Sequence, residues 1–114
     1  MIRIASWNVN GIRAAARKGL AEILTELDAD IVCLQEVKAS PDQLSEELKQ
    51  MNGYESYWAS AERKGYSGVA TYARRRPTQH TTMQLERFDS EGRVLATEYD
   101  DFVVVNAYFP NSQD

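Results

Sequence analysis

The spacing of apolar residues at the start of the chain predicts a strand, a helix and a second strand. The first strand ends at the polar turn of residues 8–11. Apolar residues at positions 12, 16, 20, 23, 24 and 27 recur with helical spacing, so residues 11–28 are predicted to form one amphipathic helix despite Gly19. The apolar run at residues 31–34 predicts the next strand. Such a βαβ unit has two parallel strands and a right-handed crossover.

The rest of the chain predicts one short helix and then a series of short strands. Ser40 and Pro41 are typical of a helix start, and Gln43 is placed to reach back to the cap. This helix is expected to end near Gln50. Short segments separated by glycine or acidic turns predict strands near residues 54–60, 68–74, 80–87, 93–99 and 102–108. The acidic stretches at 89–92 and 100–101 are typical of hairpin turns.

These elements predict an α/β fold, in which a mixed β-sheet of about seven strands carries helices on one face. Two helices cannot cover both faces of such a sheet. The segment Phe102–Val105 is apolar on both of its faces, and a strand of this kind needs cover on both sides. We therefore expect residues 1–114 to be part of a single larger domain.

Composition narrows the range of functions. The chain has 114 residues with 13 Lys and Arg against 17 Asp and Glu, a formal net charge of −4. This balance excludes binding of nucleic acid through a large excess of positive charge, but not nucleic-acid chemistry that uses a metal ion. No apolar run is long enough for a membrane helix, and the start lacks the pattern of a signal peptide. The single cysteine, Cys33, has no partner for an internal disulfide, and a cytoplasmic protein fits best.

Polar side chains follow both strands of the βαβ unit. Asn8 and Asn10 follow the first strand and Glu36 follows the second, so parallel pairing places them at one edge of the sheet, where α/β proteins bind ligands. Asn106, Tyr108 and Asn111 mark the end of the last strand, whose edge the pattern alone does not determine. Amide and carboxylate oxygens suit a hard cation such as Mg²⁺.

Other kinds of site are poorly supported. The isolated His80 and Cys33 argue against zinc, which is held by clustered imidazoles and thiolates. The glycines at 65 and 68 lack the spacing and the lysine of a phosphate-binding loop.

Each candidate also has a plainer structural interpretation. Asn8, Asn10 and Gly11 fit a strand-to-helix turn with a helix cap, Glu36 fits a solvated loop carboxylate, and Tyr108 fits an ordinary strand aromatic. Arg13 and Lys38 fit surface charges. Spacing and composition alone leave metal-assisted phosphate chemistry as one option among these.

Five segments, taken in order, resemble one family. They are Ser6–Ala14, Leu34–Lys38, Gly65–Val69, Glu91–Val94 and Asn106–Asn111. Together they resemble the apurinic/apyrimidinic endonucleases of the exonuclease III type, within the endonuclease/exonuclease/phosphatase superfamily. The resemblance covers nearly the whole chain. It implies a four-layer α/β sandwich, of which this chain is the N-terminal part and the C-terminal half is absent.

The resemblance also implies an activity and a partner. The activity is hydrolysis of a DNA phosphodiester 5′ to an abasic site, with 3′-to-5′ exonuclease and 3′-phosphatase activities at the same site. The partner is double-stranded DNA with abasic sites or 3′ ends, acted on in base excision repair with no membrane involved. The cofactor is Mg²⁺, with Mn²⁺ as a substitute.

Roles follow from the resemblance at matching positions. Glu36 is the metal carboxylate, Asn8 orders the metal site and a catalytic aspartate, and Tyr108 donates a hydrogen bond to the scissile phosphate. The remaining positions are associated with substrate contacts or support of the site: Asn10, Arg13, Lys38, Tyr66, Arg93 and Asn111. In the family, the general base and its partners lie in an Asp-x-Asn segment and an Asp-His pair downstream of these residues. We therefore expect the 114-residue chain alone to be catalytically incomplete.

Two other functions stay open. One keeps the superfamily but exchanges the substrate for RNA, an inositol phosphate or a phospholipid. The other is a non-enzymatic binding module, in which the asparagines are only caps.

Overall fold

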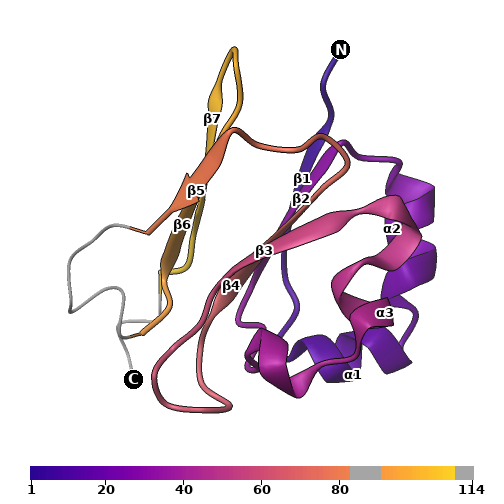
Figure 1. The fold of residues 1–114 in the computed structure, drawn as a ribbon. Helices are drawn as coiled ribbons and strands as arrows, with labels where there is room; N and C mark the ends of the chain where they lie inside the picture. The colour runs from indigo at the N-terminus through magenta and orange to yellow at the C-terminus, as the bar shows by residue number, and fades with distance from the viewer. Residues whose placement is uncertain (83–90, 110–114) are drawn as a thin grey trace.

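The strands form two sheets that pack face to face in the computed structural model, which describes residues 1–82 and 91–109 (Figure 1). The four-stranded sheet has the order β1-β2-β4-β3 and the three-stranded sheet the order β5-β6-β7. The first sheet contains β1 (Ile4–Asn8), β2 (Ile31–Gln35), β3 (Glu55–Ala59) and β4 (Val69–Ala73). The second contains β5 (Gln79–Thr81), β6 (Val94–Glu98) and β7 (Val103–Ala107).

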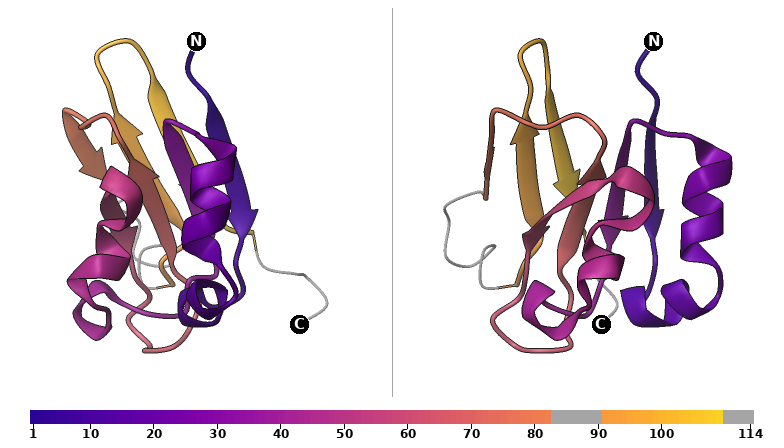
Figure 2. Two further views of the ribbon diagram at one scale, coloured as in Figure 1. Left: turned by 90° about the vertical axis from the view of Figure 1, so that its right-hand side faces the viewer. Right: turned by 45° about the vertical axis from the view of Figure 1, so that its right-hand side comes forward.

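The helices all lie on the face of the four-stranded sheet that is turned away from the second sheet, so the described chain has three layers (Figure 2). This arrangement confirms the α/β class. The prediction of one helix over residues 11–28 is wrong, because the segment divides into α1 (Ile12–Arg17) and α2 (Leu20–Leu27). Gly19 stands between them with a φ of +101°, a left-handed conformation that interrupts the helix and caps the start of α2.

The predicted second helix is also divided, into η1 (Pro41–Gln43), α3 (Glu46–Lys49) and η2 (Met51–Gly53). The capping box at Ser40 is present, since the Gln43 side chain accepts a hydrogen bond from the Ser40 N–H at 3.0 Å. Leu44 is extended and ends this first turn. Ser45 then caps a new helix, because its hydroxyl accepts a hydrogen bond from the Leu48 N–H.

A single sheet of about seven strands was the wrong expectation. β1 and β2 are parallel, β4 is antiparallel to both β2 and β3, and the chain then crosses to the second, antiparallel sheet. The turn at residues 100–101 joins β6 to β7 as predicted. β5 covers the start of the strand expected at 80–87, while residues 83–87 and the beginning of the turn at 89–92 lie outside the described residues.

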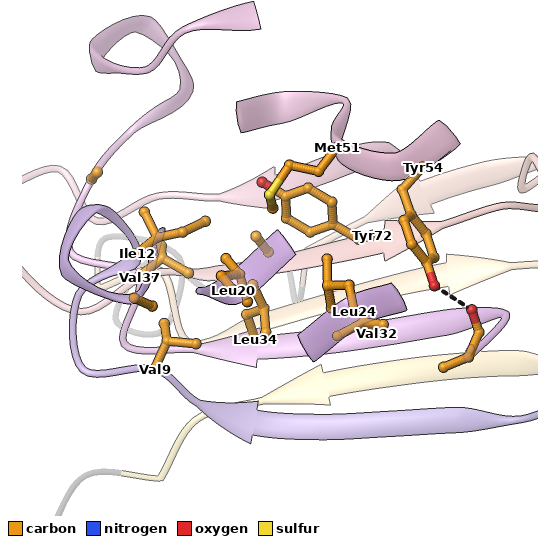
Figure 3. Packing of buried hydrophobic residues seen from close by; sticks show 14 residues of the cluster. Val9, Ile12, Leu20, Leu24, Val32, Leu34, Val37, Met51, Tyr54 and Tyr72 are labelled. Atoms are coloured by element: carbon orange, nitrogen blue, oxygen red, sulfur yellow. Dashed lines mark hydrogen bonds between the residues drawn. The ribbon is translucent and has the colours of Figure 1, made fainter. Parts of the chain in front are cut away.

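Two apolar layers hold these elements together. The larger lies between the helices and the four-stranded sheet, where Leu20, Leu24, Leu34 and Tyr72 have no exposed surface (Figure 3). The Tyr54 hydroxyl reaches across this layer and donates a hydrogen bond to a backbone carbonyl ahead of β2. The smaller layer lies between the two sheets, and it contains Ile31, Cys33, Val69, Ala73, Leu95 and Val104. Burial of these side chains supplies most of the favourable free energy of folding.

The predicted apolar strand Phe102–Val105 has cover on one face. Val104 faces the four-stranded sheet and is buried, whereas Val103 and Val105 on the other face are 54% and 61% exposed. Ile4 on the neighbouring edge strand β1 is 50% exposed and shares an open apolar groove with Val103. Among residues 1–82 and 91–109, none of the helices has the length and apolar character of a membrane span.

Candidate active site

The ends of three strands meet at one edge of the structure. β1 and β2 run parallel with Asn8 opposite Gln35, so Glu36 follows directly beside Asn8. The Asn8 Nδ2 donates a hydrogen bond to Glu36 Oε1 at 3.1 Å. β7 ends at the same edge, because Tyr108 and Glu36 line a common cavity. The predicted meeting of positions 8 and 36 is therefore present, and the structure adds Tyr108 from the second sheet.

This site cavity has a volume of about 290 Å³ and a mixed polar lining. The residues that line it lie in four segments next to strands of both sheets: Glu36, Lys38, Tyr66, Ser67, Glu91, Arg93 and Tyr108. Two carboxylates, two cationic side chains and two hydroxyl-bearing rings thus face one space. Such a set of groups is suited to a ligand that carries negative charge together with a cation.

The backbone around the cavity is strained. Asn10, Glu36, Lys38 and Ser67 all have left-handed φ values, between 48° and 55°. Side chains in this region cost about 1–3 kcal/mol each, and such residues concentrate at functional sites. Hydrogen bonds between the loops stabilise these backbone conformations. Gly11 N–H donates to Glu36 O at 2.7 Å, and Lys38 N–H donates to Ser67 O at 2.8 Å. The strained turns direct the Glu36 and Lys38 side chains into one cavity.

Glu36 is held as a carboxylate. The hydrogen bond from Asn8 lowers the pKa of Glu36, and it outweighs the opposing effect of burial. Hydrogen bonding with Tyr108 and the charge of Lys38 lower this pKa further, with Lys38 Nζ 3.7 Å from Glu36 Oε2. An ionised, half-buried carboxylate beside a polar cavity is an appropriate ligand for a hard divalent cation.

The asparagines organise the turn rather than cap the helix. Asn8 Oδ1 accepts a hydrogen bond from the Asn10 N–H at 3.0 Å, which is an Asx turn, and Asn10 Oδ1 accepts one from Lys38 Nζ at 2.6 Å. The N-cap of α1 is Gly11, with no side-chain hydrogen bond. The strand-to-helix turn of the plainer interpretation is therefore present and Gly11 is the cap residue, but neither asparagine side chain caps α1. Asn8 connects to Glu36 and Asn10 connects to Lys38, so both asparagines position charged groups of the site.

Of the three predicted cationic residues, two line the cavity and one lies outside its lining. Lys38 and Arg93 line the cavity, and Arg93 forms an ion pair with Glu91 at 2.6 Å. Arg13 lies outside the cavity lining on α1, where its guanidinium donates to the Lys38 carbonyl at 3.4 Å. Tyr66 is 54% exposed at the cavity rim, with the Arg63 guanidinium 5.1 Å from its ring centroid.

The described residues do not contain a cluster of three or more His, Cys, Asp or Glu side chains that could hold a metal ion. Cys33 is buried between the sheets, where desolvation raises the pKa of its thiol. His80 packs against Tyr57 with ring centroids 5.0 Å apart, away from the cavity lining. The oxygen atoms that the cavity offers belong to carboxylates and hydroxyl groups. They suit a Mg²⁺ ion that keeps most of its water ligands.

Reasoning from the sequence missed three polar residues of this region. Ser67 and Glu91 line the cavity, and in the described part of the chain the buried Ser67 hydroxyl has no hydrogen-bond partner. Gln35 is buried between the sheets directly before Glu36. They lie in segments that carry the family resemblance, but nothing in the spacing distinguishes these positions from turn and strand residues. Asn111 lies outside the described residues.

Residues 5–113 match the model of the Endonuclease/Exonuclease/phosphatase family. The chain belongs to this family. The exodeoxyribonuclease of Bacillus subtilis is 41% identical over 114 residues, which are 98% of this chain and 44% of that protein. The chain thus spans less than half the length of this relative. The family consists of metal-dependent nucleases.

Solved structures agree with this assignment. An AP endonuclease from Archaeoglobus fulgidus superposes with a TM-score of 0.83 at 29% identity, over 96% of this chain and 42% of that one. A 3′ phosphatase from Neisseria, solved bound to a product DNA hairpin, superposes with a TM-score of 0.81 at 28% identity, over 95% and 41% of the two chains. These relatives share the fold described above.

Proposed function

We propose that this chain supplies the metal-binding and phosphate-binding half of a DNA repair nuclease, which hydrolyses phosphodiesters at abasic sites and removes residues from 3′ ends. The observation that carries the proposal is the convergence of Glu36 and Tyr108 on one cavity that also holds Lys38 and Arg93. Asn8 joins this group through its hydrogen bond to Glu36. The names of the relatives, an exodeoxyribonuclease and an AP endonuclease, support the choice of DNA as substrate.

The contacts of each residue support one role in this proposal. Asn8 fixes the orientation of Glu36 through its hydrogen bond, and Glu36 is the protein's carboxylate ligand for Mg²⁺, or for Mn²⁺ as a substitute. When bound there, the cation stabilises the negative charge that builds up on the phosphate during hydrolysis. Tyr108 donates a hydrogen bond toward a phosphate oxygen, as a preorganised neutral donor in the same cavity.

The cations and the outer polar groups hold the DNA backbone. Lys38 and Arg93 line the cavity that receives the phosphate, while Arg13, Tyr66, Asn10 and Asn111 are proposed contacts or supports for the flanking backbone. A few cations are sufficient on a chain of net charge −4, because phosphate contacts position the nucleic acid through local geometry.

The 114-residue chain alone is proposed to be inactive. Hydrolysis needs a group that removes a proton from the attacking water, a contribution of about 10²- to 10⁴-fold. The cavity's two carboxylates are both engaged, Glu36 with Asn8 and Glu91 with Arg93, so neither is a free base. We place the base in the remainder of the domain, consistent with a match to only 44% of the Bacillus relative.

A chimera tests this proposal directly. This chain replaces the aligned region of the Bacillus subtilis exodeoxyribonuclease, and the product is assayed with Mg²⁺ on duplex DNA that carries one abasic site. We expect metal-dependent incision in the chimera, loss in Glu36→Gln, and full activity in Glu26→Gln, which alters an exposed carboxylate on α2. Residues 1–114 alone should show no incision.

The alternatives give different results in the same assay. Turnover of RNA, an inositol phosphate or a phospholipid by the chimera, with abasic DNA left intact, would replace the proposed substrate. A folded chimera that is inactive on every substrate would favour a binding module. Incision by residues 1–114 alone that disappears in Glu36→Gln would show that the chain contains its own base.

A further inference from the structure

A buried polar bridge joins the two sheets immediately behind the site cavity. Asn106 on β7 is 2% exposed and Gln35 on β2 is 9% exposed. The Gln35 side-chain amide donates a hydrogen bond to Asn106 Oδ1 at 2.9 Å. The Asn106 Nδ2 donates to Ala70 O at 3.0 Å, to Thr71 Oγ1 at 3.2 Å and to Leu34 O at 3.3 Å. Every partner of this side chain is on β2 or β4, so each hydrogen bond crosses from one sheet to the other.

The surroundings make such a bridge informative. Apolar side chains make up most of the layer between the sheets, although Thr71 and Thr97 are also buried there. Apolar contacts are non-directional, so they tolerate small shifts of one sheet over the other. A buried amide costs several kcal/mol unless its hydrogen bonds are made. Sliding the second sheet by even one residue would break all four bonds of Asn106 at once. The bridge therefore fixes the alignment of the two sheets at this end.

The bridge is adjacent in sequence to the groups that need alignment. Gln35 is followed by Glu36, whose carboxylate lies in the cavity. Asn106 is two residues before Tyr108, so both face the four-stranded sheet. Glu36 and Tyr108 come from different sheets, and their separation depends on how the sheets are aligned.

We propose that Asn106, acting through Gln35 and the β4 backbone, is a positioning residue that holds the Tyr108 hydroxyl against Glu36. The importance of this alignment for catalysis rests on the proposed function, in which Tyr108 and Glu36 act on one phosphate. The bridge itself can be tested without metal or DNA.

The test uses the chain labelled with 3-fluorotyrosine, whose Tyr108 signal is assigned by its loss in Tyr108→Phe. In the wild-type background, Glu36→Gln should shift the ¹⁹F resonance of Tyr108, because it changes the hydrogen bond between the two groups. In the Asn106→Leu background, which keeps the volume but removes the polar atoms, the same substitution should cause no shift. In Thr97→Val, a buried position on the same inner face of the second sheet, the shift should remain.

Each result decides a separate question. A Tyr108 response that persists in folded Asn106→Leu overturns the positioning role, whatever happens to thermal stability. If Asn106→Leu does not fold, Gln35→Met, which leaves the bonds of Asn106 to β4 in place, makes the same test from the other side. Unfolding of both variants would mean that the bridge holds the fold rather than the site, which also overturns the proposal. A separate Mn²⁺ titration of the wild-type chain tests the proposed function. If the wild type does not bind Mn²⁺ while the Tyr108 response is lost in Asn106→Leu, only the proposed function is contradicted.

Discussion

Gly92 is the position at which a single added methyl group should disturb the site most. It precedes β6 with a φ of +60°, and a Cβ there would lie 2.5 Å from Ala61 N, 2.6 Å from Ser60 C and 2.7 Å from Ala59 O. These are backbone atoms at the end of β3, so they cannot move aside as a flexible side chain would. Its neighbours in sequence, Glu91 and Arg93, line the site cavity.

The cost of Gly92→Ala can be worked out in two parts. The left-handed φ costs an L residue about 1–2 kcal/mol. Forcing the methyl group into close-packed backbone adds about 1–3 kcal/mol. The sum of about 2–5 kcal/mol is a large share of the stability of a small domain, which is about 5–15 kcal/mol.

Gly53→Ala is the matched control. Gly53 also has a left-handed φ, of +81°, but nothing lies within 4 Å of the Cβ position. Gly53→Ala should therefore lower the free energy of unfolding only by the cost of the left-handed φ, about 1–2 kcal/mol. Urea unfolding of both variants measures the difference. Equal losses in the two variants would refute the claim that the end of β3 contacts residue 92 this closely.

Three further predictions follow from individual contacts. Asn8→Ala should raise the pKa of Glu36 and cost about 1 kcal/mol at neutral pH. The hydrogen bond lowers the pKa of Glu36 in the folded state, so its stabilisation of the fold is complete above the unfolded-state pKa and disappears as the pH falls through the folded-state pKa. The free energies of unfolding of variant and wild type should therefore converge in acid. NMR titration of Glu36 measures the change in pKa. Lys38→Met in the chimera should weaken binding to duplex DNA and reduce the slope of log affinity against log salt by about 1, measured by fluorescence anisotropy. Leu24→Ala should cost about 2–5 kcal/mol in thermal unfolding because this side chain has no exposed surface, whereas Leu27→Ala, 40% exposed on the same helix, should cost less than about 1 kcal/mol.

The part of the site that could be predicted from sequence is the part that depends on local rules. A strand, a helix and a strand with short joints must place their two parallel strands side by side. The meeting of Asn8 and Glu36 follows from that rule, since Asn8 ends the first strand and Glu36 directly follows the second. The capping box at Ser40 can also be predicted from the sequence, because its signature lies within four consecutive residues.

What could not be predicted depends on contacts between distant segments. The division into two sheets is decided by packing across the apolar layer, and the strand pattern is compatible with one sheet or two. The edge reached by Tyr108 depends on every reversal of direction before it. The bridge between Gln35 and Asn106 spans 71 positions. The break at Gly19 shows a different limit, since an isolated glycine is tolerated in many helices and ends only some.

The most direct test of the central claim is the affinity of this chain for a divalent cation, measured with Mn²⁺ by electron paramagnetic resonance. We predict saturable binding by the wild-type chain and no change in Glu26→Gln. Glu36→Gln should lose at least about ten-fold in affinity, or about 1.4 kcal/mol. Equal Mn²⁺ affinity in wild type and Glu36→Gln would contradict the assignment of Glu36 as the metal ligand of the site.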